Sequence, residues 1–195
     1  YKIKPDVDNA VLNVMNTAAF INGPEVKFFQ SELETYLDVK HVIPCANGTD
    51  ALQIALMALN LQEGDEVITA DFTFAATVEV IHLLKLKAVL VDVDYDTFSM
   101  DTEKLKAAIT PKTKAVIPVH LFGQCSNMEE ILNISKQNNL HVIEDNAQAI
   151  GSDFTFSDGT VKKSGTMGIL GTTSFFPSKN LGCYGDGGAI FTNDD

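Results

Sequence analysis

Residues 115–145 read AVIPVHLFGQCSNMEEILNISKQNNLHVIED, and this stretch decides the fold. Its first five residues form a continuous apolar run that predicts a buried strand, and 141–145 predicts a second strand of the same kind. Between them, apolar residues recur at helical spacing over 128–138, which predicts an amphipathic helix. A strand, a helix and a strand in this order are typical of parallel strands that are connected by a helix on one face of a sheet.

The same alternation extends over most of the chain. It predicts one α/β domain, a three-layer sandwich in which helices cover both faces of a mostly parallel sheet, with a small N-terminal helical lead. Residues 154–156 and 160–162, beside Asp158-Gly159, predict a hairpin with a primed turn. The other predicted strands are 41–45, 67–69, 88–93, 172–176 and 188–192, and the other predicted helices are 8–20, 24–38, 49–60, 75–84 and 102–109.

The composition limits the classes of function. The chain has 195 residues, a formal net charge of −12 and 45% hydrophobic residues. An acidic chain of this kind is not expected to bind nucleic acid or an anionic membrane surface, and no apolar run reaches the roughly 18 residues of a membrane span. No secretory leader opens the sequence, and Cys45, Cys125 and Cys183 match neither a disulfide framework nor a zinc site. We therefore expect a cytoplasmic protein without a metal site.

The basic residues are unusual, because all 14 are lysines. Arginine is the common ligand of planar carboxylates and diphosphates. Either such ligands are held differently here, or the arginines lie in sequence that follows residue 195. The chain stops directly after the strand-like run 188–192, and we therefore expect it to be incomplete.

The run Ser174-Phe175-Phe176-Pro177-Ser178-Lys179-Asn180-Leu181-Gly182 places one lysine among apolar and small residues. Burying a lysine is costly unless its amine is neutralised or used covalently. A buried Lys179 with Ser174 five residues earlier suggests an imine to an aldehyde cofactor whose phosphate the serine holds. The ordinary alternative is an exposed lysine on a surface loop.

Ligands of open α/β sheets lie beyond the carboxyl ends of the strands, so the polar residues there are candidates for a site. Gly48, Thr49 and Asp50 follow the first strand, where glycine permits a tight turn and the free N–H groups of a helix N-terminus can hold a phosphate. The alternative is a simple N-cap by Asn47 or Thr49. Phe74 follows the next strand and could stack on an aromatic ring, although a single phenylalanine more often packs in a core.

Asp145 ends the strand 141–145. A buried carboxylate at this position is tolerable if it pairs with a protonated pyridine nitrogen, and the alternative is an aspartate that caps the following turn. Gln148 could donate to a ring phenolate, and the small Ala147 would let the ring lie close. We assign His120 a supporting, hydrogen-bonded position and no catalytic role. Together these residues supply the parts of a site for pyridoxal 5′-phosphate.

Four motifs make the chain similar to a known family: 46–52 (ANGTDAL), 72–77 (FTFAAT), 144–148 (EDNAQ) and 174–188. They resemble the DegT/DnrJ/EryC1/StrS aminotransferases, fold-type-I enzymes that use pyridoxal phosphate to aminate keto sugars on nucleotide carriers. The resemblance covers essentially the whole chain. It implies an aspartate-aminotransferase-like large domain over residues 1–195, followed by a smaller C-terminal domain, and an active site shared across a homodimer interface.

The resemblance also implies a role for each candidate residue. Lys179 forms the imine with the cofactor, and Asp145 pairs with its pyridine nitrogen. Gln148 contacts the phenolate oxygen, and Phe74 stacks on the ring beside Ala147. Ser174 binds the phosphate together with the backbone amides that follow Gly48, namely those of Thr49 and Asp50.

The expected substrates follow from the same resemblance: L-glutamate as amino donor and a keto sugar nucleotide as acceptor. The loop 176–188 is most similar to members that act at C3, first those that aminate UDP-2-acetamido-2-deoxy-3-oxo-glucuronate and then those that act on dTDP-linked sugars. Two alternatives remain open. Some relatives are sugar dehydratases, in which a histidine replaces the lysine, and proteins with this kind of fold can also bind the cofactor as non-catalytic regulators.

Overall fold

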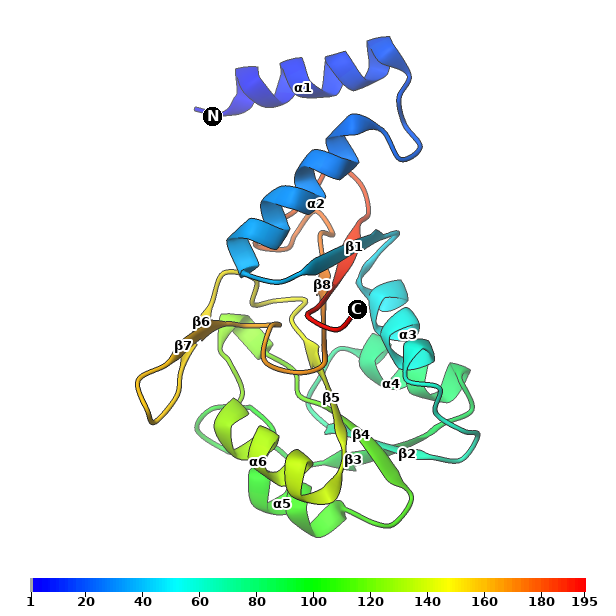
Figure 1. The fold of residues 1–195 in the computed structure, drawn as a ribbon, viewed down its shortest axis with the longest axis vertical. Helices are drawn as coiled ribbons and strands as arrows, with labels where there is room; N and C mark the ends of the chain where they lie inside the picture. The colour runs from blue at the N-terminus through cyan, green and yellow to red at the C-terminus, as the bar shows by residue number, and fades with distance from the viewer. Residues whose placement is uncertain (1) are drawn as a thin grey trace.

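A seven-stranded sheet runs through the centre of the molecule (Figure 1). The structure is a computed structural model, and it describes residues 2–195. The strands lie in the order β1-β9-β8-β5-β4-β2-β3, in which β9 is antiparallel to both of its neighbours and all other adjacent pairs are parallel. The mostly parallel sheet is thereby confirmed. The strands are β1 (His41–Cys45), β2 (Glu66–Ala70), β3 (Lys87–Val91), β4 (Thr113–Ile117), β5 (His141–Asp145), β8 (Leu170–Ser174) and β9 (Gly188–Thr192).

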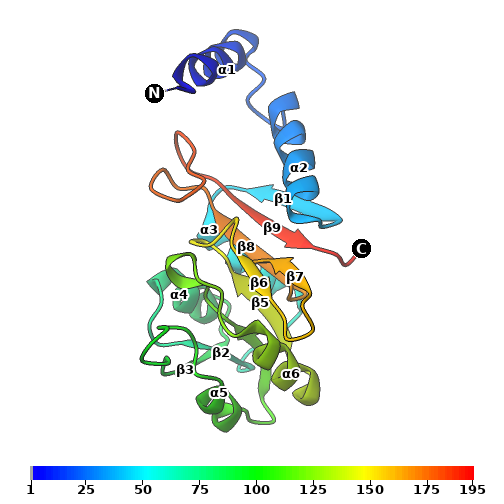
Figure 2. The same ribbon diagram turned by 90° about the vertical axis from the view of Figure 1, so that its left-hand side faces the viewer.

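Helices cover both faces of the sheet, as predicted. Because successive side chains of a strand point to opposite faces, Val67 and Ile143 contact α3 and α4, whereas Ile68 and Val142 contact α5 and α6. Figure 2 shows α3 and α4 on one side of the strands and α5 and α6 on the other. These helices are α3 (Gly48–Ala58), α4 (Ala75–Leu83), α5 (Thr102–Ala108) and α6 (Met128–Asn138).

The N-terminal lead consists of two helices with different burial. α2 (Pro24–Leu37) packs Leu33 and Leu37 against β1 and β9 in a third apolar cluster. α1 (Lys4–Thr17) has no buried residue and lies at the far end of the molecule, beyond α2 (Figure 1, Figure 2). The helical lead is therefore present, but only its second helix contributes to the core.

Two strands begin and end earlier than predicted. β4 ends at Ile117 because Pro118 has no N–H to continue the ladder, and Val119 pairs with Asp145 only as an isolated bridge. β8 ends at Ser174 instead of continuing to residue 176. The chain therefore leaves the sheet immediately after Ser174, which makes the lysine run a loop.

The hairpin is present, but its predicted primed turn is wrong. β6 (Asp153–Thr155) pairs with β7 (Val161–Lys163). Of the turn residues, only Gly159 has a positive φ, of 87°. A primed type I turn needs positive φ at both central residues, whereas a three-residue loop ends in one left-handed residue, which glycine adopts without strain.

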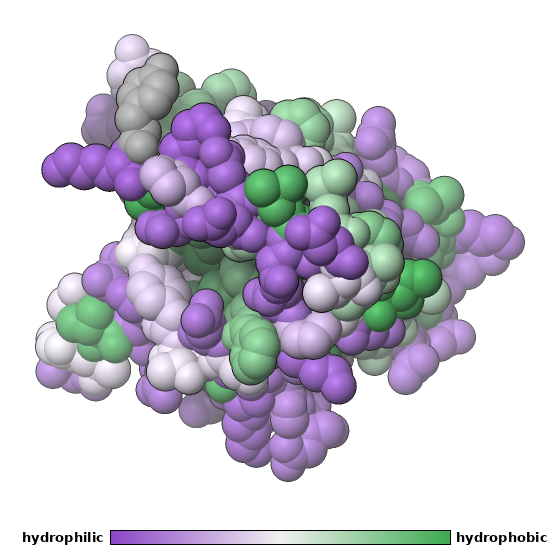
Figure 3. Space-filling model, turned by 90° about the horizontal axis from the view of Figure 1, so that it is seen from above, coloured by the Kyte–Doolittle hydropathy of each residue, from purple (hydrophilic) through white to green (hydrophobic). Residues whose placement is uncertain are grey.

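The face of the molecule seen from above is mixed in character. Hydrophilic residues make up much of this face, with hydrophobic residues interspersed among them (Figure 3). Within residues 2–195, no helix combines the length and the apolar character needed to cross a bilayer. The same residues hold no group of three or more His, Cys, Asp or Glu side chains arranged to bind a metal ion.

Candidate active site

A cavity of about 560 Å³ opens at the carboxyl ends of β1, β5 and β8. It lies where the sequence places the site, because these three strands run in the same direction and end at the same edge. The structure brings all nine predicted residues together in its lining: Gly48, Thr49, Asp50, Phe74, Asp145, Ala147, Gln148, Ser174 and Lys179.

The N-terminus of α3 forms one end of the cavity. The Asn47 side chain caps this helix and accepts a hydrogen bond of 2.8 Å from the N–H of Asp50. That amide is therefore already engaged, and the first-turn amides of Gly48 and Thr49 are the ones without an intrahelical acceptor. The cap and the phosphate cradle, which the sequence offered as alternatives, are compatible in one helix.

Close approach of Gly48 to Ser174 completes this end. A Cβ on Gly48 would lie 2.6 Å from Cβ of Ser174, which no real side chain tolerates. The Ser174 hydroxyl oxygen accepts from the N–H of Phe176 at 3.3 Å, which leaves its proton available to a ligand. Only glycine lets the helix N-terminus and this hydroxyl converge, and together they form a cradle for an anion.

Asp145 lies at the inner end of the cavity and is 4% exposed. One of its oxygens accepts from the Thr77 hydroxyl at 2.8 Å, and the other accepts from the N–H of Ala147 at 3.2 Å. Burial raises the pKa of Asp145 above its ordinary value, and these two hydrogen bonds, with the charge of Lys179, oppose the rise. A cationic group on a ligand would stabilise this carboxylate further.

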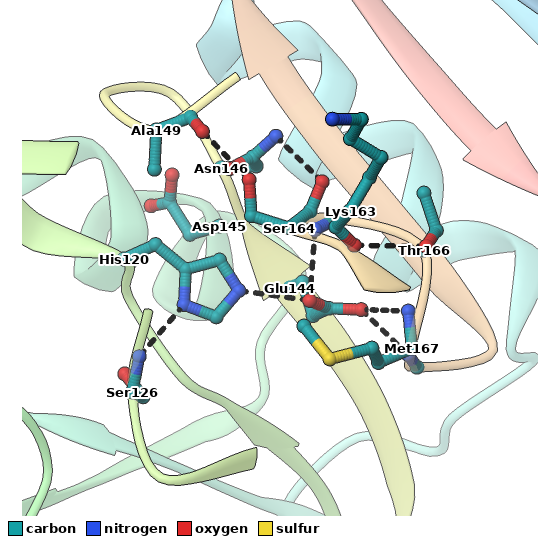
Figure 4. Close-up of polar contacts among 12 residues, drawn as sticks. His120, Ser126, Glu144, Asp145, Asn146, Ala149, Lys163, Ser164, Thr166 and Met167 are labelled. Carbon is teal, nitrogen blue, oxygen red and sulfur yellow. Dashed lines mark hydrogen bonds and ion pairs between the residues drawn. The ribbon is translucent and has the colours of Figure 1, made fainter. Parts of the chain in front are cut away.

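His120 and Glu144 form a buried pair beside Asp145 (Figure 4). His120 Nδ1 accepts from the N–H of Ser126 at 3.1 Å, so the ring proton is on Nε2, which donates to Glu144 at 2.8 Å. The Glu144 carboxylate also accepts from the amides of Gly165, Met167 and Gly168. The expected supporting position of His120 is confirmed, and the residue that it supports is Glu144.

Gln148 and Phe74 lie nearer the cavity opening. The Gln148 oxygen accepts from the N–H of Phe122 at 2.9 Å, which leaves its amide NH₂ as a donor for a ligand. Phe74 is the residue before α4 and is 69% exposed, so its ring is free to contact a ligand. The core-packing alternative for Phe74 is excluded.

Lys179 is half-buried, and the expectation of a buried lysine is wrong in this respect. The loop that carries it is exposed at Phe176, Pro177 and Ser178, because β8 ends before the lysine run begins. The neighbouring Asn180 anchors this loop through a hydrogen bond to the Ile150 carbonyl. Lys179 therefore reaches the cavity from its rim, where an amine can exchange between solvent and a ligand.

Sequence reasoning missed some residues that line the cavity or support its lining. Thr77, whose hydroxyl contacts Asp145, lies in a quoted motif but carries no local signal, because its partner is distant in sequence. Ser178 and Asp186 lie in the quoted lysine loop and also line the cavity. The only sequence signal that could have identified these two residues as part of the site is their closeness to Lys179 in the chain.

The donor set defines the ligand that fits. An anion fits the cradle at Gly48, Thr49 and Ser174, and a ring nitrogen that carries a proton fits Asp145. An aldehyde carbon between them would lie within the cavity that Lys179 lines. The residues present therefore fit pyridoxal phosphate.

Comparisons with known proteins agree with this geometry. Residues 2–195 match the DegT/DnrJ/EryC1/StrS aminotransferase family. The chain is 48% identical over 194 residues to the UDP-2-acetamido-2-deoxy-3-oxo-D-glucuronate aminotransferase of Pseudomonas aeruginosa, covering 100% of this chain and 53% of that protein. It is also 48% identical over 194 residues to the pleiotropic regulatory protein of Geobacillus stearothermophilus, covering 100% of this chain and 51% of that protein.

Solved structures show the same fold. An aminotransferase of this family from Brucella abortus superposes with a TM-score of 0.93 and 44% identity, over 99% of this chain and 52% of that one. NtdA of Bacillus subtilis with bound cofactor PMP superposes with a TM-score of 0.89 and 37% identity, over 100% of this chain and 42% of that one. The chain thus spans about half the length of the curated relatives that it matches. The chain belongs to the DegT/DnrJ/EryC1/StrS aminotransferase family.

Proposed function

We propose that this chain is the cofactor-binding part of a pyridoxal-phosphate-dependent aminotransferase. The enzyme would move an amino group from L-glutamate to the C3 keto group of a UDP- or dTDP-linked sugar in the cytoplasm. The observation that carries the proposal is the convergence of Lys179, Asp145 and Ser174 on one cavity in a chain of this family. A smaller C-terminal domain and a second subunit that completes the site belong to the same proposal.

Each residue has a task that its position supports. The amides of Gly48 and Thr49 and the Ser174 hydroxyl hold the phosphate, and Asp145 orients the ring through its nitrogen. Bound pyridoxal phosphate would supply the electron sink and the carrier for the amino group. The Gln148 NH₂ donates to the ring oxygen, and Phe74 covers one face of the ring.

Lys179 is the residue that moves protons. Its position at the rim would let the amine hold the cofactor and, once released, carry a proton from the donor's α-carbon to the aldehyde-derived carbon of the cofactor. The raised pKa of Asp145 in the cavity falls when a protonated ring nitrogen lies against it, so ligand and carboxylate stabilise each other's charge.

The C3 specificity and the uridine carrier rest on the similarity to the Pseudomonas aeruginosa enzyme, which acts on a 3-oxo sugar by its name. The sugar would enter from the open side, past Ser178 and Asp186, whose oxygens can accept hydrogen bonds from hydroxyl groups.

The decisive experiment uses the intact protein, loaded with pyridoxal phosphate, L-glutamate and a panel of 3-keto and 4-keto nucleotide sugars. We expect release of more than one equivalent of 2-oxoglutarate per active site only when a keto sugar is present to take up the amino group, and borohydride treatment should leave the cofactor attached to Lys179, as seen by mass spectrometry. Lys179→Ala should abolish both results, whereas Lys162→Ala, at an exposed position of β7, should preserve them. Normal turnover in Lys179→Ala would refute the proposal.

A non-catalytic regulator is the second candidate, because the chain is equally similar to a protein named for pleiotropic regulation. A regulator of this kind would bind pyridoxal phosphate but would not turn over glutamate to 2-oxoglutarate, whichever sugar is supplied. A sugar dehydratase would release a deoxy keto sugar that carries no new amino group. The 2-oxoglutarate assay, with mass spectrometry of the sugar product, therefore distinguishes the transaminase from both alternatives.

A further inference from the structure

Two threonines and one aspartate form a hydrogen-bonded chain at the inner end of the cavity. The Thr77 hydroxyl donates to Asp145 at 2.8 Å, and the hydroxyl oxygens of Thr73 and Thr77 are 3.1 Å apart. Thr77 has one hydroxyl proton and uses it on Asp145. Thr73 must therefore donate to Thr77, so that both O–H groups point toward the carboxylate.

We propose that Thr77 is a positioning residue that holds the Asp145 carboxylate ionised and in a fixed orientation, and that Thr73 reinforces it. The part of the proposal that concerns the cofactor rests on the function proposed above, since Asp145 would face the ring nitrogen. The part that concerns the carboxylate itself depends only on the contacts in this chain.

The geometry supports positioning because the two donors come from different elements. Thr77 lies on α4 and donates to one oxygen of Asp145, whereas the Ala147 N–H lies in the turn after β5 and donates to the other. Two directed hydrogen bonds on two oxygens define the plane of a carboxylate. Ala147 is tied to Asp145 by two residues of chain, so Thr77 supplies the independent constraint.

The electrostatics act in the same direction. Burial raises the pKa of Asp145, and the Thr77 hydroxyl is the largest influence that lowers it, ahead of the Ala147 amide. The ionisable side chains that act on Asp145 are His120, behind it, and Lys179, at the rim. The His120 ring donates to Glu144 and not to Asp145, which leaves the hydroxyl of Thr77 as the main fixed dipole on the carboxylate.

Burial alone does not explain why residue 77 is a threonine. Thr77 is 0% exposed, and valine has the same shape without the hydroxyl. Thr77→Val therefore removes the donor with little change in packing, and Thr77→Ser keeps the donor but removes a methyl group. Comparing these two variants separates the effect of the lost hydrogen bond from the effect of lost packing.

The first test needs no cofactor. Infrared difference spectra of the intact protein, taken against Asp145→Asn, isolate the carboxyl band of Asp145 during a pH titration. We expect Thr77→Val to move the midpoint up by about one pH unit, Thr73→Val to move it up by less, and Thr77→Ser to leave it near the wild-type value. Thr73 is only partly buried, so we expect Thr73→Val to fold. Its titration midpoint then tests the inference even if Thr77→Val folds poorly.

The second test measures the dissociation constant of pyridoxal phosphate by absorbance. Thr77→Val should raise it about tenfold, and Thr77→Ser should restore most of the loss. An unchanged infrared midpoint in Thr77→Val, or in Thr73→Val where Thr77→Val does not fold, would overturn the inference. If the midpoint moves but the wild-type protein binds no cofactor, the proposed function fails and the positioning role of Thr77 stands.

Discussion

The inner end of the cavity and its rim are built in opposite ways. We define the floor as Asp145, which lines the cavity, together with the buried residues behind it, Thr77, His120 and Glu144. All four are at most 4% exposed and hydrogen-bonded within the chain. The rim consists of Phe74, Phe176, Ser178 and Lys179, on loops that leave the ends of strands, and Phe74 and Phe176 are 69% and 51% exposed. The polar groups of the floor already have hydrogen-bond partners within the chain, whereas the side chains of the rim are free to contact a ligand.

The difference has a physical cause. A buried carboxylate without partners is costly, so Asp145 and Glu144 can only lie in the floor because amides, a hydroxyl and an imidazole surround them. Exposed groups at the rim have no such requirement, because water satisfies them. Substitutions in the floor should therefore have larger effects than those at the rim, and the predictions below test this ranking.

The largest effect should come from Asp145→Asn. A protonated ring nitrogen would lose the carboxylate that faces it, and an uncompensated buried charge costs about 3 kcal/mol or more, a factor above about one hundred in rate. We expect turnover of the intact enzyme to fall by at least that factor while some cofactor binding remains. Near-normal turnover would remove Asp145 from the chemistry.

The same variant should change how the stability of the cofactor-free protein depends on pH. The folded-state pKa of Asp145 is raised, so below the unfolded pKa of about 4 both states are protonated and the residue has no effect. As the pH rises to the raised pKa, the unfolded state loses its proton first and wild-type stability falls. Urea titrations should show the wild type losing stability relative to Asp145→Asn over this window, and a constant difference would contradict burial as the cause.

The next effect concerns Glu144, which belongs to the floor but does not line the cavity. Glu144→Leu would leave the amides of Gly165, Met167 and Gly168 and the His120 ring without an acceptor. We expect a loss of about 3 kcal/mol or more in the free energy of unfolding, measured by urea denaturation. Glu103→Gln, which removes an exposed partner of Lys106, should cause no measurable change.

The cradle at the edge of the floor is tested by Gly48→Ala. The new Cβ would collide with Ser174, and helix and serine would have to separate. We expect about a tenfold weaker affinity for pyridoxal phosphate, measured by absorbance titration, because part of the phosphate contact is lost. Gly185→Ala is the matched control, since a Cβ there meets nothing within 4 Å and its φ is not positive. Equal affinities in the two variants would show that the cradle tolerates the side chain.

The smallest effect should come from the rim. Phe74→Leu keeps an apolar side chain but removes a stacking surface, which contributes about 0.5–1.5 kcal/mol. We expect the dissociation constant of pyridoxal phosphate to rise up to about tenfold, with no change in stability, since Phe74 is exposed. Tyr95→Leu, at an exposed position outside the cavity, should leave the affinity unchanged. A larger effect than that of Gly48→Ala would reverse the ranking of floor and rim.

Much of the fold and of the candidate site follows from local patterns. The alternation of apolar runs and helical periodicity over residues 41–145 predicted every strand and α-helix of that region to within a few residues, but not the short 3-10 helix Leu121–Gly123. The position of Asp145 at the end of β5, and of Gly48 at the start of α3, follows from the same patterns. The burial of Lys179 and the turn at Gly159 were predicted wrongly. The point where β8 leaves the sheet depends on the neighbouring strands and not on its own residues, and the pairing of β6 with β7 sets the length of the hairpin loop.

The sequence by itself determined which elements form and which chemical groups lie at their ends, because backbone periodicity and capping act over a few residues. Only the tertiary structure decided that β9 runs against the other strands, that Gly48 meets Ser174, and that Thr77 donates to Asp145. These partners are far apart in the chain, and no local spacing encodes them. Packing of the two helical layers on the sheet brings them together, since a buried polar group is stable only where the folded chain supplies its partner.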